Sequence, residues 1–163
     1  MPNAIVVTAA NAARLEAAPI APDRILAGAP VARSKVLASS QDRTAQIVAW
    51  ECSAGEFVWH YPEDETLLVI SGEAFVTDET GKECRLAEGH VAFFPGGSSS
   101  RWRVTRPIRK VAVLRKDLPS LIGFAVRVWH KLLRICGLRG GGSLNPVTAE
   151  PAASSAIGEA CGA

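Results

Sequence analysis

Residues 55–72 read GEFVWHYPEDETLLVISG, and this stretch decides the fold class. Its first half alternates, so a β-strand there places the aromatic side chains of Phe57, Trp59 and Tyr61 on one face. A strand face made of three large aromatic side chains is either part of the core or the wall of a pocket. The second half is rich in Leu, Val and Ile and closes on Ser-Gly, which is typical of a strand that ends in a turn.

Similar short runs rich in Val, Ile, Thr and aromatic residues continue on both sides of this stretch. Glycine, proline and serine interrupt them at short intervals, and no helical pattern lies between them. This regular spacing predicts an all-β antiparallel sandwich or barrel. The expected strands span residues 43–52, 56–61, 66–71, 73–77, 83–86, 90–94, 100–105 and 108–114.

The segments that flank the β region differ from it in composition. Residues 1–33 are rich in Ala and Pro and predict an N-terminal arm, while residues 34–116 form the expected barrel. In residues 117–139, apolar side chains recur every three or four positions, which predicts one C-terminal amphipathic helix with a basic polar face. Residues 140–163 open on Gly-Gly-Gly-Ser and consist largely of small residues, so we expect a flexible tail.

The 163-residue chain has a formal net charge of only +2, but its charges are unevenly distributed. Ten acidic and two basic residues lie between Glu51 and Glu88, whereas eleven basic residues and one acidic residue lie between Arg101 and Arg139. We expect most of these opposite charges to pair across strands of the barrel.

The excess basic charge on the predicted helix, residues 118–137, leaves several partners open. An amphipathic helix of this kind packs on its own domain or on a second subunit, or contacts an anionic membrane surface. No nucleic-acid-reading motif accompanies the charge, so we expect no nucleic-acid partner.

The sequence also indicates the cellular compartment of the protein and its redox state. It has neither the ~20 uninterrupted apolar residues of a membrane-spanning helix nor the basic start and long apolar run of a secretory signal. Its four cysteines show no C-x-x-C pair and no zinc-finger spacing. We therefore expect a reduced, cytoplasmic protein.

Two segments resemble the paired motifs of the cupin superfamily. Residues 55–72 resemble the first motif, and residues 89–100, which read GHVAFFPGGSSS, resemble the second. The resemblance covers residues 30–116 and implies a double-stranded β-helix, or jelly-roll, barrel. The positions that match are Gly55, Glu65, Gly72, Gly89, Pro95 and Gly97.

The acidic and aromatic residues around these motifs are similar to one subgroup, the small cupins of the ureidoglycine aminohydrolase type. This resemblance implies a metal-dependent enzyme that hydrolyses a C–N bond in a small nitrogenous metabolite. The residues that carry it are Trp50, Glu51, Cys52, Phe57, Trp59, Tyr61, Asp64, Phe94 and Trp102.

Most of the family's metal-binding positions hold other residues here. The His positions of the first motif fall on Trp59 and Tyr61 or, with a longer gap, on a pair that includes His60, and the His of the second motif falls on Ser100. A divalent metal usually needs three or more His, Cys, Asp or Glu ligands. We therefore expect no metal cofactor. If a metal is bound, His60 and Glu65 are its candidate ligands, and Mn, Fe or Zn its candidate identity.

The same positions predict a pocket inside the barrel. A carboxylate among aromatic rings is suited to bind an amine, an amide or a planar cation, through its charge and through cation–π contacts. Glu65 is the best candidate for a catalytic residue, because an unpaired carboxylate inside a barrel costs several kcal/mol. Two alternatives are that Arg101 or Arg103 pairs with Glu65, and that the aromatic rings simply fill the interior. The predicted lining is Trp59, Tyr61, Glu65, Phe94, Ser100 and Trp102.

Three functions follow from these observations. The first is the binding of a small, nitrogen-containing ligand without a metal. The second is the metal-dependent hydrolysis implied by the resemblance, with Glu65 and His60 as metal or acid–base residues. The third is an association module that contacts a membrane or a partner protein through residues 118–137. In each case we expect a homodimer.

Overall fold

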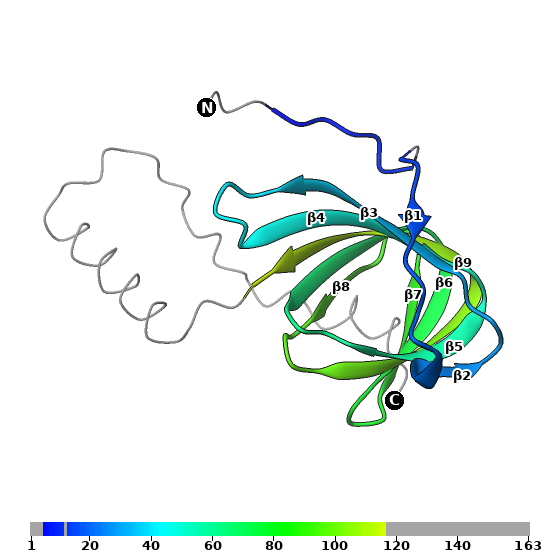
Figure 1. Cartoon of the computed structure of the whole chain (residues 1–163). Coiled ribbons are helices and arrows are strands. Elements are labelled where there is room, and N and C mark those ends of the chain that lie inside the picture. Colours follow the sequence, from blue (N-terminus) through cyan, green and yellow to red (C-terminus); the bar gives the residue numbers. More distant parts are fainter. Residues whose placement is uncertain (1–4, 12, 117–163) are drawn as a thin grey trace, which may run out of the picture. The chain divides into compact units, whose positions relative to one another are not determined.

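The computed structural model describes residues 5–11 and 13–116, which form one curled, nine-stranded sheet (Figure 1). The expected all-β fold is therefore confirmed for this range, while the predicted helix and tail, residues 117–163, lie outside it. Within the same range, no helix has the length and apolar character needed to cross a membrane. The elements are β1 (Glu16–Ala17), the 3-10 helix η1 (Pro22–Arg24), β2 (Ile25–Ala27), β3 (Ala32–Ser39), β4 (Ala45–Cys52), β5 (Gly55–His60), β6 (Asp64–Asp78), β7 (Glu83–Ala87), β8 (Val91–Phe94) and β9 (Ser99–Arg115).

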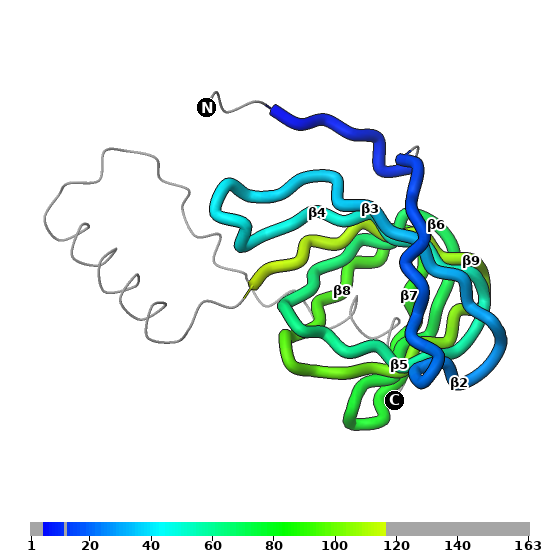
Figure 2. Tube along the Cα trace, in the orientation of Figure 1, coloured from blue at the N-terminus to red at the C-terminus, as the bar shows by residue number. Residues whose placement is uncertain are grey.

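Strand β9 organises the sheet because it pairs antiparallel with three other strands. Its first part pairs with β5 and its last part pairs with β4. Along almost its whole length it also pairs with β6, which in turn pairs with β8 and β7. The β6–β9 pair therefore joins the two parts of the sheet, whose curvature the tube in Figure 2 shows.

Strands β6 and β9 are each longer than the sequence predicts. The expected breaks at Gly72 and Pro107 are wrong, because both strands continue through these positions with local register shifts between them. Gly72 has a φ of +89°, which glycine adopts without strain. Proline lacks a backbone N–H and is tolerated in a sheet at such irregularities. The two residues therefore bend the paired strands instead of ending them.

Strand β3 is absent from the predicted set of strands. Its residues read ARSKVLAS, and only Ala32 among them is buried. The strand exists because it pairs with β4 from Ala32 opposite Cys52 to Ser39 opposite Gln46. The arm joins the sheet in the same way, since β1 pairs with β3 and β2 pairs with β5.

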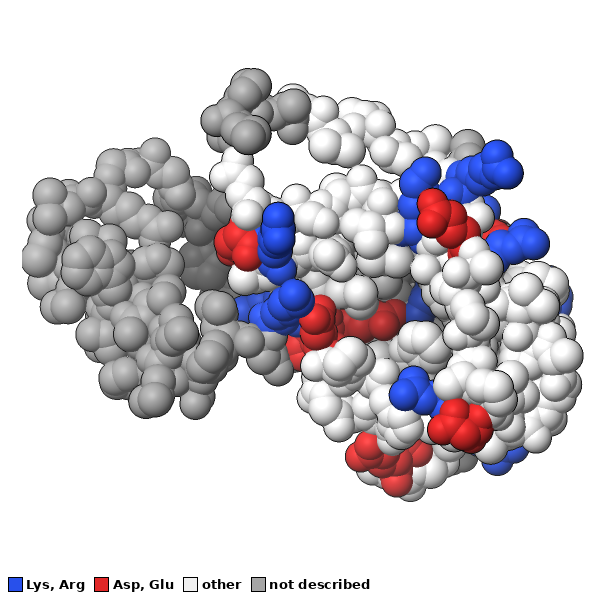
Figure 3. All heavy atoms as spheres, viewed as in Figure 1, with Lys and Arg blue, Asp and Glu red and all other residues white. Residues whose placement is uncertain are grey.

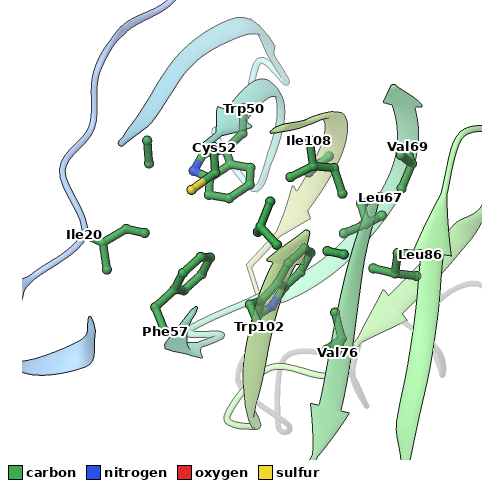
Figure 4. Packing of buried hydrophobic residues seen from close by; sticks show 14 residues of the cluster. Ile20, Trp50, Cys52, Phe57, Leu67, Val69, Val76, Leu86, Trp102 and Ile108 are labelled. Atoms are coloured by element: carbon green, nitrogen blue, oxygen red, sulfur yellow. The ribbon is translucent and has the colours of Figure 1, made fainter. Parts of the chain in front are cut away.

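The core lies inside the curl and is dominated by aromatic rings from β4, β5 and β9. Trp102 is 1% exposed and stacks on Phe57, with ring centroids 6.2 Å apart. The ring of Trp50 meets that of Phe57 edge-on at 6.3 Å. Figure 4 shows these rings packed together with aliphatic side chains of β6 and β7. The predicted aromatic face of β5 therefore points inward.

The acidic and basic segments pair with each other across strands, as expected. Figure 3 shows Lys or Arg side chains lying beside Asp or Glu side chains on the visible face. Exposed pairs of this kind contribute at most about 1 kcal/mol each. The exposed or half-buried pairs that join the two segments are Arg101–Glu56, Arg103–Glu83, Arg106–Glu73 and Arg109–Glu51, and a further pair, Lys110–Glu65, is buried.

Candidate ligand site in the barrel

The barrel interior holds a buried ion pair between Glu65 of β6 and Lys110 of β9. Lys110 Nζ lies 2.6 Å from Glu65 Oε1, and the two side chains are 6% and 7% exposed. Nζ also lies 4.8 Å from the ring centroids of both Trp50 and Trp102. The carboxylate and the two aromatic faces together compensate for removing the ammonium group from water.

The cation on Glu65 is therefore a lysine and neither of the two arginines considered from the sequence. Arg101 and Arg103 lie on the outer side of β9, where they pair with Glu56 and Glu83. Side chains two residues apart on a strand share a face, so Lys110 lies on the same face as the buried Ile108 and Ala112. The apolar character of these two neighbours is the signal that could have identified Lys110 as an inward-facing residue.

A second set of buried polar contacts consists of hydrogen bonds between Tyr61 and two residues of β9. Trp102 Nε1 donates a hydrogen bond of 2.8 Å to Tyr61 Oη, and Tyr61 Oη and Ser100 Oγ share another of 2.8 Å. The Tyr61 ring stacks on Phe94 at 4.5 Å. Burial raises the pKa of Tyr61 above its usual value, so its hydroxyl stays protonated.

Replacing Tyr61 by phenylalanine is expected to lower the free energy of unfolding by about 1–3 kcal/mol, because the indole N–H of Trp102 loses its acceptor inside the core. Urea denaturation measures this loss. Ser100→Ala removes one hydrogen bond and keeps the Trp102 contact, so it should cost less. A cost for Tyr61→Phe no larger than that for Ser100→Ala would contradict this assignment.

The structure divides the predicted lining into two groups. Tyr61, Glu65 and Trp102 are buried, and the half-buried Trp59 packs against the core, so these four fill the interior. The other two residues, Phe94 and Ser100, also line an open cleft. The barrel interior is therefore partly filled and partly open.

The cleft has a volume of about 380 Å³ and lies where β6, β7, β8 and β9 turn their inner faces toward one another. Its wall is mostly apolar, with Val76, Leu86, Ala92 and Phe94 beside the hydroxyl of Ser100. Its rim comes from the turn after β6 and from the segment between β8 and β9. The rim residues are Asp78, Glu79, Thr80, Lys82, Phe93, Pro95, Ser98 and Ser99, and Cys84 of β7 completes the lining.

Two carboxylates are held in place at this rim. Glu79 Oε1 accepts hydrogen bonds of 2.8 Å from both the backbone N and the Oγ of Ser99, so Oε2 takes part in neither. Asp78 Oδ1 accepts from the backbone N and Oγ1 of Thr80 and from the backbone N of Lys82. The hydrogen bond from the Thr80 side chain is the main cause that lowers the pKa of Asp78, which keeps this carboxylate ionised. Sequence reasoning missed both acids because they lie outside the two motifs, Asp78 as the last residue of β6 and Glu79 in the turn after it.

The residues considered as metal ligands do not fit a shared metal. His60 is exposed on the outer side of β5, whereas Glu65 points inward and its Oε1 already holds the Lys110 ammonium group. In residues 5–11 and 13–116, no three His, Cys, Asp or Glu side chains are grouped in a way that could hold a metal ion. Ser100, which stands where the second motif has its metal-binding His, is hydrogen-bonded to Tyr61.

The curled antiparallel sheet with a ligand-sized opening inside it is the architecture that the two motifs predict. Residues 39–112 match the family model described as the EutQ-like cupin domain. A search of curated proteins finds no match.

Several solved structures are similar to this chain. A protein of unknown function of the DUF861 family from Pseudomonas syringae is 23% identical, with 63% of this chain and 45% of that chain covered and a TM-score of 0.58. The chain thus spans under half the length of that protein. A predicted oxalate decarboxylase from Thermotoga maritima is 17% identical, with 68% and 99% covered and a TM-score of 0.53. A putative ethanolamine utilization protein, EutQ, from Salmonella typhimurium is 25% identical, with 54% and 72% covered and a TM-score of 0.48.

Proposed function

We propose that this cupin domain binds a small molecule that carries a cationic nitrogen group in the barrel cleft. The observation that carries the proposal is that one part of the barrel interior is filled by the core around Trp102, while the part beside Phe94 is an open cleft. The cleft volume of about 380 Å³ lies within the ~300–1,000 Å³ range of small-molecule sites.

The lining supports a particular chemistry for this ligand. Its apolar part packs on Leu86 and Phe94, and its nitrogen group pairs at the rim with Oε2 of Glu79, the carboxylate oxygen that is not bonded to Ser99. Asp78 adds a second negative charge, and among the described residues Lys82 is the one basic residue in the lining. A cationic ligand is therefore favoured over an anionic one.

Binding is favoured over the C–N hydrolysis that the resemblance implies. Glu65, the candidate catalytic carboxylate, is neutralised by Lys110 and does not line the cleft. A general acid or base must reach the reacting group directly or through one water. The buried Tyr61 and Ser100 side chains are already bonded to each other, so their hydroxyls are also committed.

The test uses benzylamine and its uncharged counterpart benzyl alcohol as probes, with titration calorimetry of the full chain. We expect benzylamine to bind and benzyl alcohol to bind at least about tenfold more weakly, because only the amine makes a charge-assisted hydrogen bond. Glu79→Gln should weaken benzylamine binding by a similar factor.

The matched control is Glu83→Gln, which removes an exposed carboxylate of β7 that pairs with Arg103 and lies outside the cleft lining. This variant should bind benzylamine as the unmodified chain does. Equal binding of the two probes, or equal losses in Glu79→Gln and Glu83→Gln, would refute the proposed role of the rim.

Other expectations from the sequence stay predictions. They are the absence of a metal cofactor, the homodimer, the cytoplasmic location, the similarity to the ureidoglycine aminohydrolase subgroup, and an association role for residues 118–137.

A further inference from the structure

A row of charged side chains lies outside the cleft, across the neighbouring strands β3, β4 and β9. Strand register places Glu51 opposite Arg33 on one side and opposite Arg109 on the other. Arg109 Nη1 lies 3.1 Å from Glu51 Oε2, whereas Arg33 Nη1 lies 3.6 Å from Oε1, beyond hydrogen-bonding distance. The Arg33 side chain is 56% exposed, so its guanidinium donors face solvent and remain able to bind a ligand.

The N-terminal arm crosses this row and brings a third arginine to it. Arg109 Nε donates to the carbonyl oxygen of Ala10 at 3.1 Å, and Nη2 donates to that of Ala13 at 2.8 Å. These two bonds fix the arm against β9 directly before Arg14. Arg14 is exposed and lines the same cavity as Arg33 and Arg109.

Two cavities meet at this row and share Arg33, Glu51 and Arg109. One has a volume of about 560 Å³ and extends past the hydroxyl-bearing residues Ser53 and Ser71. The other has a volume of about 440 Å³ and extends along the arm. Within residues 5–11 and 13–116, no residue that lines either of them also lines the barrel cleft.

The charged and apolar residues that line these cavities are suited to bind an organic anion. Three guanidinium groups face one carboxylate, which leaves an excess of two positive charges. Val31, Pro107 and Ile108 form an apolar side. Burial raises the pKa of the Cys52 thiol to about 11, so the floor beside Ile108 is neutral at pH 7. In Figure 3, basic side chains surround acidic ones in the region where Figure 1 places β1 and β3.

We propose that these cavities form a second ligand site, which binds a small organic dianion through Arg33, Arg14 and Arg109. Guanidinium groups bind phosphate and carboxylate oxygens in a two-pronged geometry, so both a phosphate monoester and a dicarboxylate carry the required chemistry. The combined space is larger than an inorganic ion needs, and the apolar side accommodates the rest of the molecule.

The experiment titrates the full chain with phenyl phosphate and, separately, with phthalate, at constant ionic strength because surface charges are screened by salt. We expect at least one of these dianions to bind. Arg33→Gln should weaken that binding about tenfold through the loss of a charge-assisted hydrogen bond. Arg14→Gln should weaken it in the same direction, and Glu51→Gln should strengthen it by removing the opposing charge.

The matched control is Arg106→Gln, because Arg106 is 66% exposed and lies 3.6 Å from Glu73, in close parallel to Arg33 and Glu51. This variant should bind like the unmodified chain. The proposal is overturned if neither dianion binds or if Arg33→Gln and Arg106→Gln weaken binding equally. Whichever probe binds more tightly identifies the phosphate or the carboxylate form of the ligand. Benzylamine binding in the cleft is measured independently, so either site can fail without the other.

Discussion

Replacing Lys110 by methionine is expected to lower the free energy of unfolding by about 3–5 kcal/mol, the usual cost of leaving a buried charge without its partner. Methionine occupies a similar volume between the rings of Trp50 and Trp102, so packing is largely kept. The carboxylate of Glu65, however, loses the ammonium group 2.6 Å away. Urea denaturation followed by tryptophan fluorescence measures the change.

The double variant Lys110→Met, Glu65→Leu separates charge from packing. Replacing both partners of a buried ion pair by apolar residues is often neutral or stabilising, so the double variant should recover most of the lost stability. If it is as unstable as Lys110→Met alone, the loss comes from packing around the lysine stem. A single variant as stable as the unmodified chain would contradict the buried pair itself.

This pair also changes the interpretation of Glu65. The sequence places a carboxylate among aromatic rings, which suggests a catalytic or ligand-binding role. In the structure, the same carboxylate balances a cation that lies between two indole rings. Glu65 is therefore better explained as the partner of the buried Lys110 than by a reaction in the cleft.

Replacing Gly72 by alanine is expected to lower the free energy of unfolding by at least about 3 kcal/mol, within the range of severe backbone strain and overpacking. A Cβ at this position would lie 2.0 Å from the carbonyl oxygen of Pro107 and 2.6 Å from the Cα of Ile108. Both are backbone atoms of β9, so relief requires β6 and β9 to separate at their bend. Urea denaturation of the purified variant, or its failure to accumulate as folded protein, measures the effect.

Gly81→Ala is the matched control for this prediction. Gly81 has a φ of +87°, close to the +89° of Gly72, but a Cβ there would meet nothing within 4 Å. Its alanine variant carries the conformational penalty alone, about 1 kcal/mol. Equal losses in the two variants would show that the close approach to Pro107 contributes nothing.

The all-β fold and the inward face of β5 were predictable from the sequence. The lengths of β6 and β9, which continue through Gly72 and Pro107, were not. Alternation in residues 55–61 correctly predicts which side of β5 faces inward, because that pattern is local to one strand. Gly72 and Pro107 also have recognisable local preferences, but whether they end a strand or bend it depends on the strand paired with them. Strand β3 lacks a clear pattern of its own and is ordered by β4.

The candidate site was predictable to a similar extent. Phe94 and Ser100 follow from the second motif and do line the cleft. The rim acid Glu79 is positioned by Ser99, 20 residues further along the chain, and no local pattern reports such a contact. The arginine row at Glu51 likewise depends on the register of three strands.

The position of β9 in the chain has a consequence for how the domain is made. This strand pairs with β4, β5 and β6, yet it begins only at Ser99, after all three have been synthesised. A nascent chain that has not yet exposed residues 99–115 therefore carries three strands with open edges, which favour association between chains. Pairing over such long sequence separations also slows folding. A chaperone that binds unpaired strand edges would therefore prevent association most effectively in the interval before residues 99–115 have been synthesised.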